Sequence, residues 1–167
     1  KNENKIGYFN IEIIEVFSPY FFDNKLKTLI LVSSVNVLKI LTPELQKNIN
    51  IYNLFLNLLT YLKDEKRNII LDYVYWELDF LKEIGFDLDL NKLNFKNING
   101  KEFINIFIDD ENYNLPTFIL NRSYSNVKEK HIFQALNFIG NYIQTKILKP
   151  NNLLYPKFRY NLQNLYK

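Results

Sequence analysis

The feature that most constrains this chain is a helix-length segment that is apolar on almost every side. Within residues 65–84, one stripe at helical spacing holds Ile70, Tyr73, Val74, Leu81 and Ile84, and further apolar residues cover most of the remaining surface, namely Ile69, Trp76, Leu78 and Phe80. A helix that is apolar nearly all round is buried on all sides. The sequence therefore predicts a mainly α fold built around this segment, and Gly85 is expected to end it in a left-handed conformation.

One acid interrupts the apolar stripe. Glu77 lies between Val74 and Leu81. An unpaired carboxylate in such a position is costly and would otherwise become neutral. We therefore predict that Glu77 is a buried structural acid, paired with a basic or hydroxyl-bearing side chain or with a helix-end amide. A catalytic general acid is the alternative interpretation, and it has less support because the sequence places no second acid or base nearby.

Capping signals predict where the other helices begin. Asp23 or Asn24 suits the cap of a first helix, and Thr42-Pro43-Glu44 is typical of the start of a second, with a capping hydroxyl, a proline and an acid in order. Asp64 is expected to start the central helix. Residues 126–129 resemble a capping box in which Asn replaces the usual hydroxyl residue, and they precede the next apolar periodic segment.

Two segments have the features of strands instead. Apolar and polar residues alternate over residues 6–15, which predicts a strand. Because a single strand is not stable alone, we expect its partners upstream of Lys1 and a domain boundary between residues 1–17 and 18–167. Within residues 91–108, Asn99-Gly100 is a strong hairpin signal flanked by apolar residues. We therefore predict a small β-hairpin inserted between the helices.

The charge distribution singles out the C-terminal third. Residues 117–167 carry eight bases and one acid, a net charge of +7, whereas residues 1–116 carry a net charge of −4. Such an excess indicates a polyanion or an acidic peptide as partner, the alternative being a merely solvated face. Aromatic residues are interleaved with the last bases, as in nucleic-acid binding surfaces. The candidate DNA- or acidic-peptide-binding residues are Lys128, Lys130, Lys146, Lys149, Lys157 and Arg159.

Several kinds of site are excluded by composition. The chain has no cysteine and a single histidine, His131, so thiolate metal sites and a Cys–His or two-histidine catalytic pair are ruled out. The four glycines are scattered singly, which argues against a phosphate-binding glycine loop. No apolar run has the length of a membrane span. We predict no catalytic residue, no metal and no cofactor.

The order of these elements resembles a known family, the bacterial recombination mediator RecO. The segment YVYWELDFLKEIGFDLDLNKL, residues 73–93, is similar to that family's aromatic-Glu-Leu triplet followed by Leu-Gly-aromatic-x-Leu-Asp-Leu. Residues 6–15 resemble the last strand of the family's N-terminal OB fold, and residues 115–119 its Leu-Pro-x-Phe-Leu stretch. Residues 135–147 and 155–159 are similar to its last two helices. The likeness is greatest to alphaproteobacterial members.

The chain also departs from the family pattern. Many members carry cysteine zinc ligands around the hairpin, beginning near Leu93, and this chain has no cysteine. Members often have an arginine before the aromatic-Glu-Leu triplet, where Tyr75 stands here. Most of the OB fold, which is the family's main DNA-binding module, is expected to be missing from this chain.

The resemblance implies a non-enzymatic mediator of DNA recombination and repair. Such a protein binds and anneals single-stranded DNA and acts with RecR to load RecA onto strands covered by single-strand binding protein. It also docks the acidic C-terminal tail of that protein through its helical domain, and it is cytoplasmic and associated with the bacterial nucleoid. The alternative from a different class is a helical protein–protein adaptor that makes no nucleic-acid contact.

Overall fold

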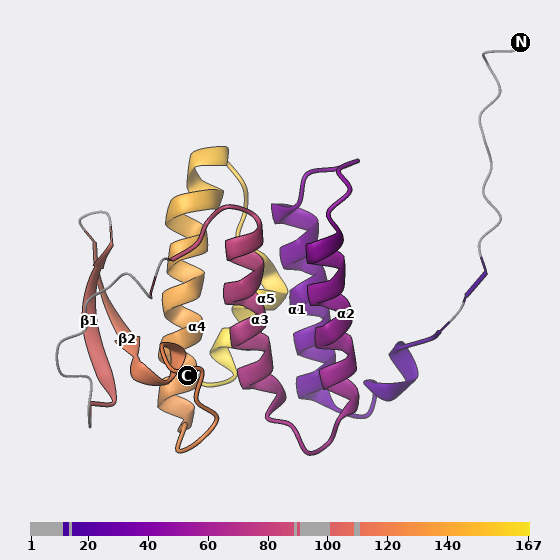
Figure 1. The fold of residues 1–167 in the computed structure, drawn as a ribbon, viewed down its shortest axis with the longest axis horizontal. Helices are drawn as coiled ribbons and strands as arrows, with labels where there is room; N and C mark the ends of the chain where they lie inside the picture. Colours follow the sequence, from indigo (N-terminus) through magenta and orange to yellow (C-terminus); the bar gives the residue numbers. More distant parts are fainter. Residues whose placement is uncertain (1–11, 14, 89, 91–100, 109–110) are drawn as a thin grey trace, which may run out of the picture.

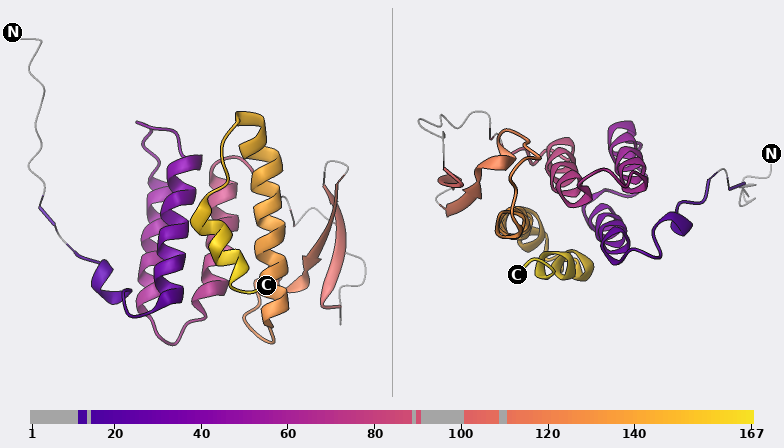
Figure 2. Two further views of the ribbon diagram at one scale, coloured as in Figure 1. Left: turned by 180° about the vertical axis from the view of Figure 1, so that it is seen from behind. Right: turned by 90° about the horizontal axis from the view of Figure 1, so that it is seen from below.

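A computed structural model describes residues 12–13, 15–88, 90, 101–108 and 111–167. The helices are α1 (Lys25–Leu41), α2 (Ile49–Lys63), α3 (Ile69–Glu83), α4 (Glu129–Ile143) and α5 (Lys157–Asn164), and the strands are β1 (Phe103–Ile108) and β2 (Glu111–Pro116). Figure 1 shows α3 between the α1–α2 pair and α4, with the strands outside α4. From behind, α5 lies between α1 and α4 and packs against both (Figure 2). The prediction of a mainly α fold with a small hairpin is confirmed.

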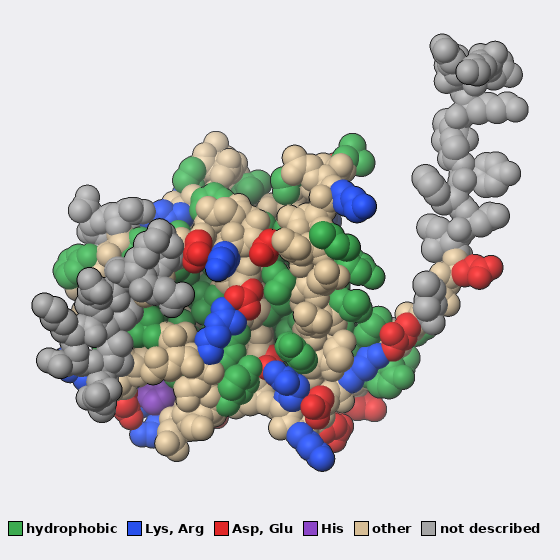
Figure 3. Space-filling model, in the orientation of Figure 1, with side chains coloured by type: hydrophobic (Ala, Val, Ile, Leu, Met, Phe, Trp, Pro, Cys, Tyr) green, Lys and Arg blue, Asp and Glu red, His purple; other side chains and the backbone are tan. Residues whose placement is uncertain are grey.

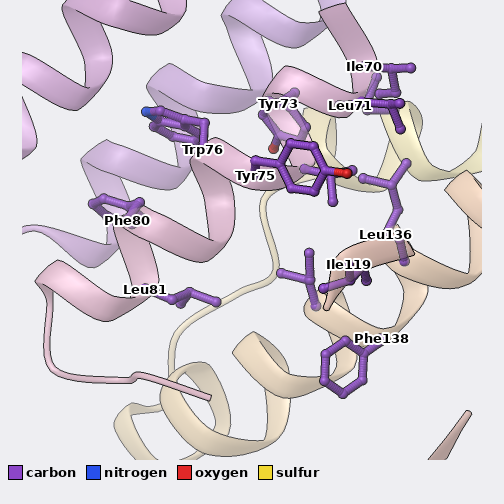
Figure 4. Close-up of a cluster of buried hydrophobic side chains, with 14 of the residues drawn as sticks. Ile70, Leu71, Tyr73, Tyr75, Trp76, Phe80, Leu81, Ile119, Leu136 and Phe138 are labelled. Atoms are coloured by element: carbon purple, nitrogen blue, oxygen red, sulfur yellow. The ribbon is translucent and has the colours of Figure 1, made fainter. Parts of the chain in front are cut away.

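The central position of α3 is also confirmed. Every residue from Ile69 to Glu77 is buried, and so are Phe80 and Leu81. Trp76 stacks on Phe80 with ring centroids 5.5 Å apart, and Figure 4 shows both rings on one flank of α3. Side chains from α4 and from the turn after β2 fill the opposite flank. Neighbours thus enclose the first half of α3, while Leu78 and Asp79 are half-buried and Lys82 and Glu83 are exposed.

Helix boundaries follow some of the capping signals and depart from others. The side chain of Asn24 caps α1 by accepting the Lys27 amide at 3.0 Å, and Gly85 follows α3 with a φ of +87°, both as expected. The start predicted at Thr42-Pro43 was wrong. Thr42 ends α1, because its hydroxyl donates to the Leu38 carbonyl at 2.6 Å.

The structure places the starts of the next three helices later than predicted. Asn48 caps α2, its side chain accepting two amides at 3.1 Å. Asp64 ends α2, and α3 begins only at Ile69. In place of the predicted box at 126–129, Lys128 caps α4, and the side chain of His131 accepts the Lys128 amide at 3.1 Å. A side chain takes the first free amides only at α2, because Asn68 makes no side-chain cap hydrogen bond at the start of α3.

The hairpin lies later in the chain than expected. Strand β1 pairs antiparallel with β2, which follows it, in a register that sets Ile106 opposite Tyr113. Asn99-Gly100, the predicted turn, and the strand expected before it fall outside the described residues. Within β2, Tyr113 and Leu115 are buried while Asn112 and Asn114 are exposed. This alternation packs the hairpin on α4, where Tyr113 meets Phe138 edge to face at 5.3 Å.

The strand predicted for residues 6–15 lies mostly outside the described residues. Its described members, Glu12, Ile13 and Glu15, belong to no helix or strand. A domain boundary near residue 18 therefore stays a prediction. Among the described residues, no helix is both long enough and apolar enough to span a bilayer.

Candidate functional site

A buried ion pair joins three helices at the middle of the fold. Arg159 of α5 donates from Nε to Oε1 of Glu77 at 2.6 Å and from Nη2 to Oε2 at 2.9 Å. The same Nη2 donates to the Leu136 carbonyl of α4 at 2.8 Å, and the hydroxyl of Tyr73 donates to Oε1 of Glu77 at 3.1 Å. Both charged side chains have 0% exposure. The prediction that Glu77 is buried and paired is confirmed.

The electrostatics of this cluster keep the Arg159 guanidinium charged. Burial alone would lower the pKa of Arg159, but the adjacent Glu77 carboxylate reverses that effect, and the pKa is raised. Burial and the neighbouring carboxylate raise the pKa of the Tyr73 hydroxyl, which keeps it protonated as a donor. Arg159 was therefore wrongly placed among the anion-binding residues, because its guanidinium is enclosed and already holds a carboxylate.

A second arginine of the C-terminal third also pairs with an acidic side chain of this chain. Arg122 donates from Nη1 to Oδ2 of Asp79 on α3 at 2.9 Å. Nearby, Arg67 donates from Nε to Oδ2 of Asp72 at 2.9 Å, and the hydroxyl of Tyr124 donates to the same carboxylate at 2.7 Å. These pairs were not foreseen. Arg122–Asp79 and Arg159–Glu77 together balance two of the eight positive charges after residue 116 with acids before it.

The five candidate lysines do not form a single patch. Lys128 and Lys130 lie at the start of α4, Lys146 and Lys149 lie beyond its end, and Lys157 begins α5. The 15 residues of α4 span about 22 Å. All are exposed except Lys146, which is half-buried. The basic residues thus occupy separate places along the α4–α5 side of the fold.

At the start of α4, two of these lysines converge on one carboxylate. Lys128 Nζ lies 3.0 Å from Oε1 of Glu102, and Lys130 Nζ forms an ion pair with Oε2. The imidazole Nε2 of His131 lies 3.5 Å from the same Oε2. Figure 3 shows the single histidine in purple beside acidic and basic side chains. Sequence reasoning missed Glu102, because it lies 26 residues from Lys128.

The charge of Glu102 should depend on this pairing. Hydrogen bonds from Lys130 and then Lys128 lower its pKa to about 2. Because the folded pKa lies below the unfolded one, the pair stabilises the fold above the ordinary glutamate pKa, and the contribution is lost as pH falls towards about 2. An NMR titration of the Glu102 side-chain carboxyl should show this low midpoint. In the K128Q/K130Q variant the midpoint should rise towards the ordinary value, and an unchanged midpoint would contradict the assignment.

A polar cleft between α4 and α5 contains the fifth lysine. The cleft has a volume of about 560 Å³, and its lining comprises Asn137, Gly140, Asn141, Gln144, Tyr155, Lys157, Tyr160 and Gln163. This lining of described residues contains no carboxylate. Lys157 and Tyr160 are exposed, whereas Tyr155 is half-buried against α4. Gly140 permits that approach, since a Cβ there would lie 2.5 Å from the Tyr155 hydroxyl.

An apolar groove lies where α1 and α3 end and α2 begins. Its volume is about 780 Å³, and residues from the end of α1, the start of α2, the end of α3 and the segment after α4 line it. Leu41, Tyr52, Phe55, Phe86 and Leu153 contribute much of the apolar surface. A groove of this kind suits the side chains of a partner peptide. Across the described parts of the chain, no group of three or more His, Asp or Glu side chains is arranged to hold a metal ion.

Comparison with known proteins points to one family. Residues 26–95 match the family model described as "Recombination protein O C terminal". The DNA repair protein RecO of a Wolbachia strain from Drosophila simulans is 28% identical over 99% of this chain and 60% of its own length. RecO of Rickettsia felis is 33% identical over 52% of this chain and 36% of its own length. No solved structure gives a significant match.

The matched relatives are longer than this chain. It spans 60% of the Wolbachia protein from Drosophila simulans and 38% of a second Wolbachia RecO, from Culex pipiens. The match to the family model covers α1, α2 and α3, including the central helix and its buried acid. The chain is therefore similar to the RecO family of bacterial DNA repair proteins.

Proposed function

We propose that this chain is the helical part of a non-enzymatic mediator of recombinational repair. In this proposal it contacts single-stranded DNA, supports strand annealing, and acts with RecR to load RecA onto strands covered by single-strand binding protein. The similarity to RecO proteins supports the general role in DNA repair. The cleft between α4 and α5 is the observation that supports contact with DNA.

The chemistry of that cleft suits a nucleic-acid strand bound without sequence preference. Lys157 supplies one uncompensated cation, because it makes no ion pair among the described residues. Tyr160 is 55% exposed beside it, and an exposed aromatic ring stacks on any base. The surrounding amide side chains donate and accept hydrogen bonds without adding negative charge. The cleft would therefore hold one phosphate and one base of a passing strand.

The apolar groove supports a separate docking role. We propose that it receives the C-terminal tail of single-strand binding protein, the partner that the resemblance assigns to the helical domain. Lys39 adjoins the groove residues Leu38 and Ile40 in sequence, and Lys149 lies two residues from Ile147. Both lysines are exposed, so an acidic tail would meet positive charge there. A helical adaptor without nucleic-acid contact, the second candidate, would use this groove alone.

Neutralising Lys157 tests the DNA contact. The logarithm of DNA affinity falls linearly with the logarithm of salt concentration, and removing one single-strand phosphate contact lowers the magnitude of that slope by about 0.7. A fourfold dilution of salt should therefore widen the affinity difference between wild type and K157Q by about 2.6-fold. The measurement is fluorescence anisotropy of a labelled oligonucleotide over a salt series. K66Q is the matched control, because Lys66 is exposed in the turn between α2 and α3, away from the cleft.

The same series separates the two candidate functions. If K157Q and K66Q bind DNA alike while an acidic tail peptide still binds both, the chain is a partner-docking module and the DNA proposal fails. If K157Q alone loses salt-dependent DNA affinity, the mediator proposal is supported.

A further inference from the structure

A second polar cleft opens at the N-terminal end of α4. It has a volume of about 790 Å³, and its lining includes Lys101, Glu102, Thr117, Ser123, Lys128 and His131. The N-terminus of a helix favours an anion, because its first amides point outward and carry partial positive charge. Helix α4 is 15 residues long, so this contribution is fully developed. The cleft lies at the opposite end of α4 from Lys149, and it is separate from the α4–α5 cleft.

One buried donor in this cleft has no hydrogen-bond partner. His131 has only 6% exposure, and its Nδ1 accepts the Lys128 amide, so the proton of the neutral imidazole lies on Nε2. That Nε2 makes no hydrogen bond. It faces Oε2 of Glu102 at 3.5 Å, which is too long for a good hydrogen bond. A buried donor without a partner is rare and needs an explanation.

The planar shape of the Glu102 carboxylate explains why this donor has no partner. Oε1 accepts from Lys128 and Oε2 from Lys130; Oε2 has a second lone pair, but the carboxylate holds that oxygen 3.5 Å from Nε2 of His131. A phosphate group has additional oxygens in tetrahedral directions, so it can accept from both ammonium groups and still offer an oxygen to Nε2 of His131. The donor set therefore fits a phosphate better than the carboxylate that occupies it.

We propose that this cleft is a phosphate-binding site and that Glu102 is its built-in competitor. The backbone around Glu102 is fixed, because the Thr117 amide donates to the Glu102 carbonyl at 3.0 Å and the Thr117 hydroxyl donates to the Lys101 carbonyl at 2.8 Å. Only the Glu102 side chain, 44% exposed, needs to rotate away for a phosphate to enter. The phosphate comes either from the free ion or from a nucleic-acid backbone, and only the second source rests on the proposed function.

The single histidine makes the test direct. Its ring signals in a proton NMR spectrum belong to one residue, which lines the site. Inorganic phosphate is titrated at constant pH and constant ionic strength into wild type, E102Q, and E102Q/K128Q/K130Q. Each exposed ion pair shifts an equilibrium by about 1.4- to 5-fold, so freeing both lysines should tighten phosphate binding by about 2- to 25-fold in E102Q. The triple variant should show no saturable shift of the His131 signals.

The control variant is E15Q. Glu15 pairs with Lys63 and is similarly exposed, so this change removes the same charge at a distant ion pair. It should leave phosphate affinity unchanged. If wild type and E102Q bind phosphate with equal affinity, Glu102 does not compete with phosphate. If the His131 signals of E102Q show no saturable shift, the cleft is not a phosphate-binding site. A parallel titration with a short oligonucleotide identifies the source: if free phosphate moves the His131 signals and the oligonucleotide does not, the free ion is the ligand. That outcome supports the site whether or not Lys157 contacts DNA.

Discussion

Replacing Arg159 with leucine should lower the free energy of unfolding by about 3–5 kcal/mol. The change leaves the Glu77 carboxylate at 0% exposure with Tyr73 as its remaining partner, and an uncompensated buried charge is strongly destabilising. It also removes the donor to the Leu136 carbonyl, so α5 keeps only the hydrogen bond from Gln163 to Asn137 among its described side-chain polar links to α4. Chemical denaturation followed by circular dichroism measures the loss.

A double variant separates the charge from the packing. E77L/R159L removes both charges, and buried pairs replaced by apolar side chains are often neutral in stability. We therefore expect the double variant to be more stable than R159L, with a coupling free energy that a double-mutant cycle reports. If R159L unfolds like wild type and instead loses DNA affinity, the guanidinium is a surface ligand and the structural assignment is wrong.

Truncating Leu81 to alanine should cost about 2–5 kcal/mol of unfolding free energy. Leu81 has 0% exposure on α3, and its loss leaves a cavity that a helix fixed on every side does not easily close. Thermal and chemical denaturation both report the change. Leu154→Ala is the control, because Leu154 is 87% exposed and should alter stability by no more than about 0.5 kcal/mol. A loss in L81A no larger than in L154A would contradict the central position of α3.

The core was the part of the fold most accessible to sequence reasoning. Helical periodicity reports burial directly, so the all-round apolar surface of residues 65–84 predicted a central helix, and the energetic cost of an unpaired buried carboxylate predicted a partner for Glu77. Its partner was not identified, because the two residues lie 82 positions apart. A usable signal existed: Arg159 precedes the buried Leu162 by three positions on one face of α5, and arginine is the preferred cation in buried pairs.

Local signals failed where two elements compete for the same residue. Thr42 has the side chain of an N-cap, but its hydroxyl is used by the last turn of α1. Strand β2 was overlooked because Asn112 and Asn114 give it a polar composition, although Tyr113 and Leu115 alternate with them. Glu102 became part of a site only through the pairing of residues 102 and 117, which brings it to the start of α4. Tertiary context decides each of these cases.

Glu77–Arg159 joins three helices of the fold, and we propose that DNA is contacted separately, at Lys157. The most direct test is the salt dependence of oligonucleotide binding by three proteins: wild type, E77L/R159L and K157Q. We expect E77L/R159L to keep the wild-type logarithmic salt slope. In K157Q the magnitude of that slope should be lower by about 0.7. A reduced slope in a folded E77L/R159L variant, with an unchanged slope in K157Q, would contradict both expectations.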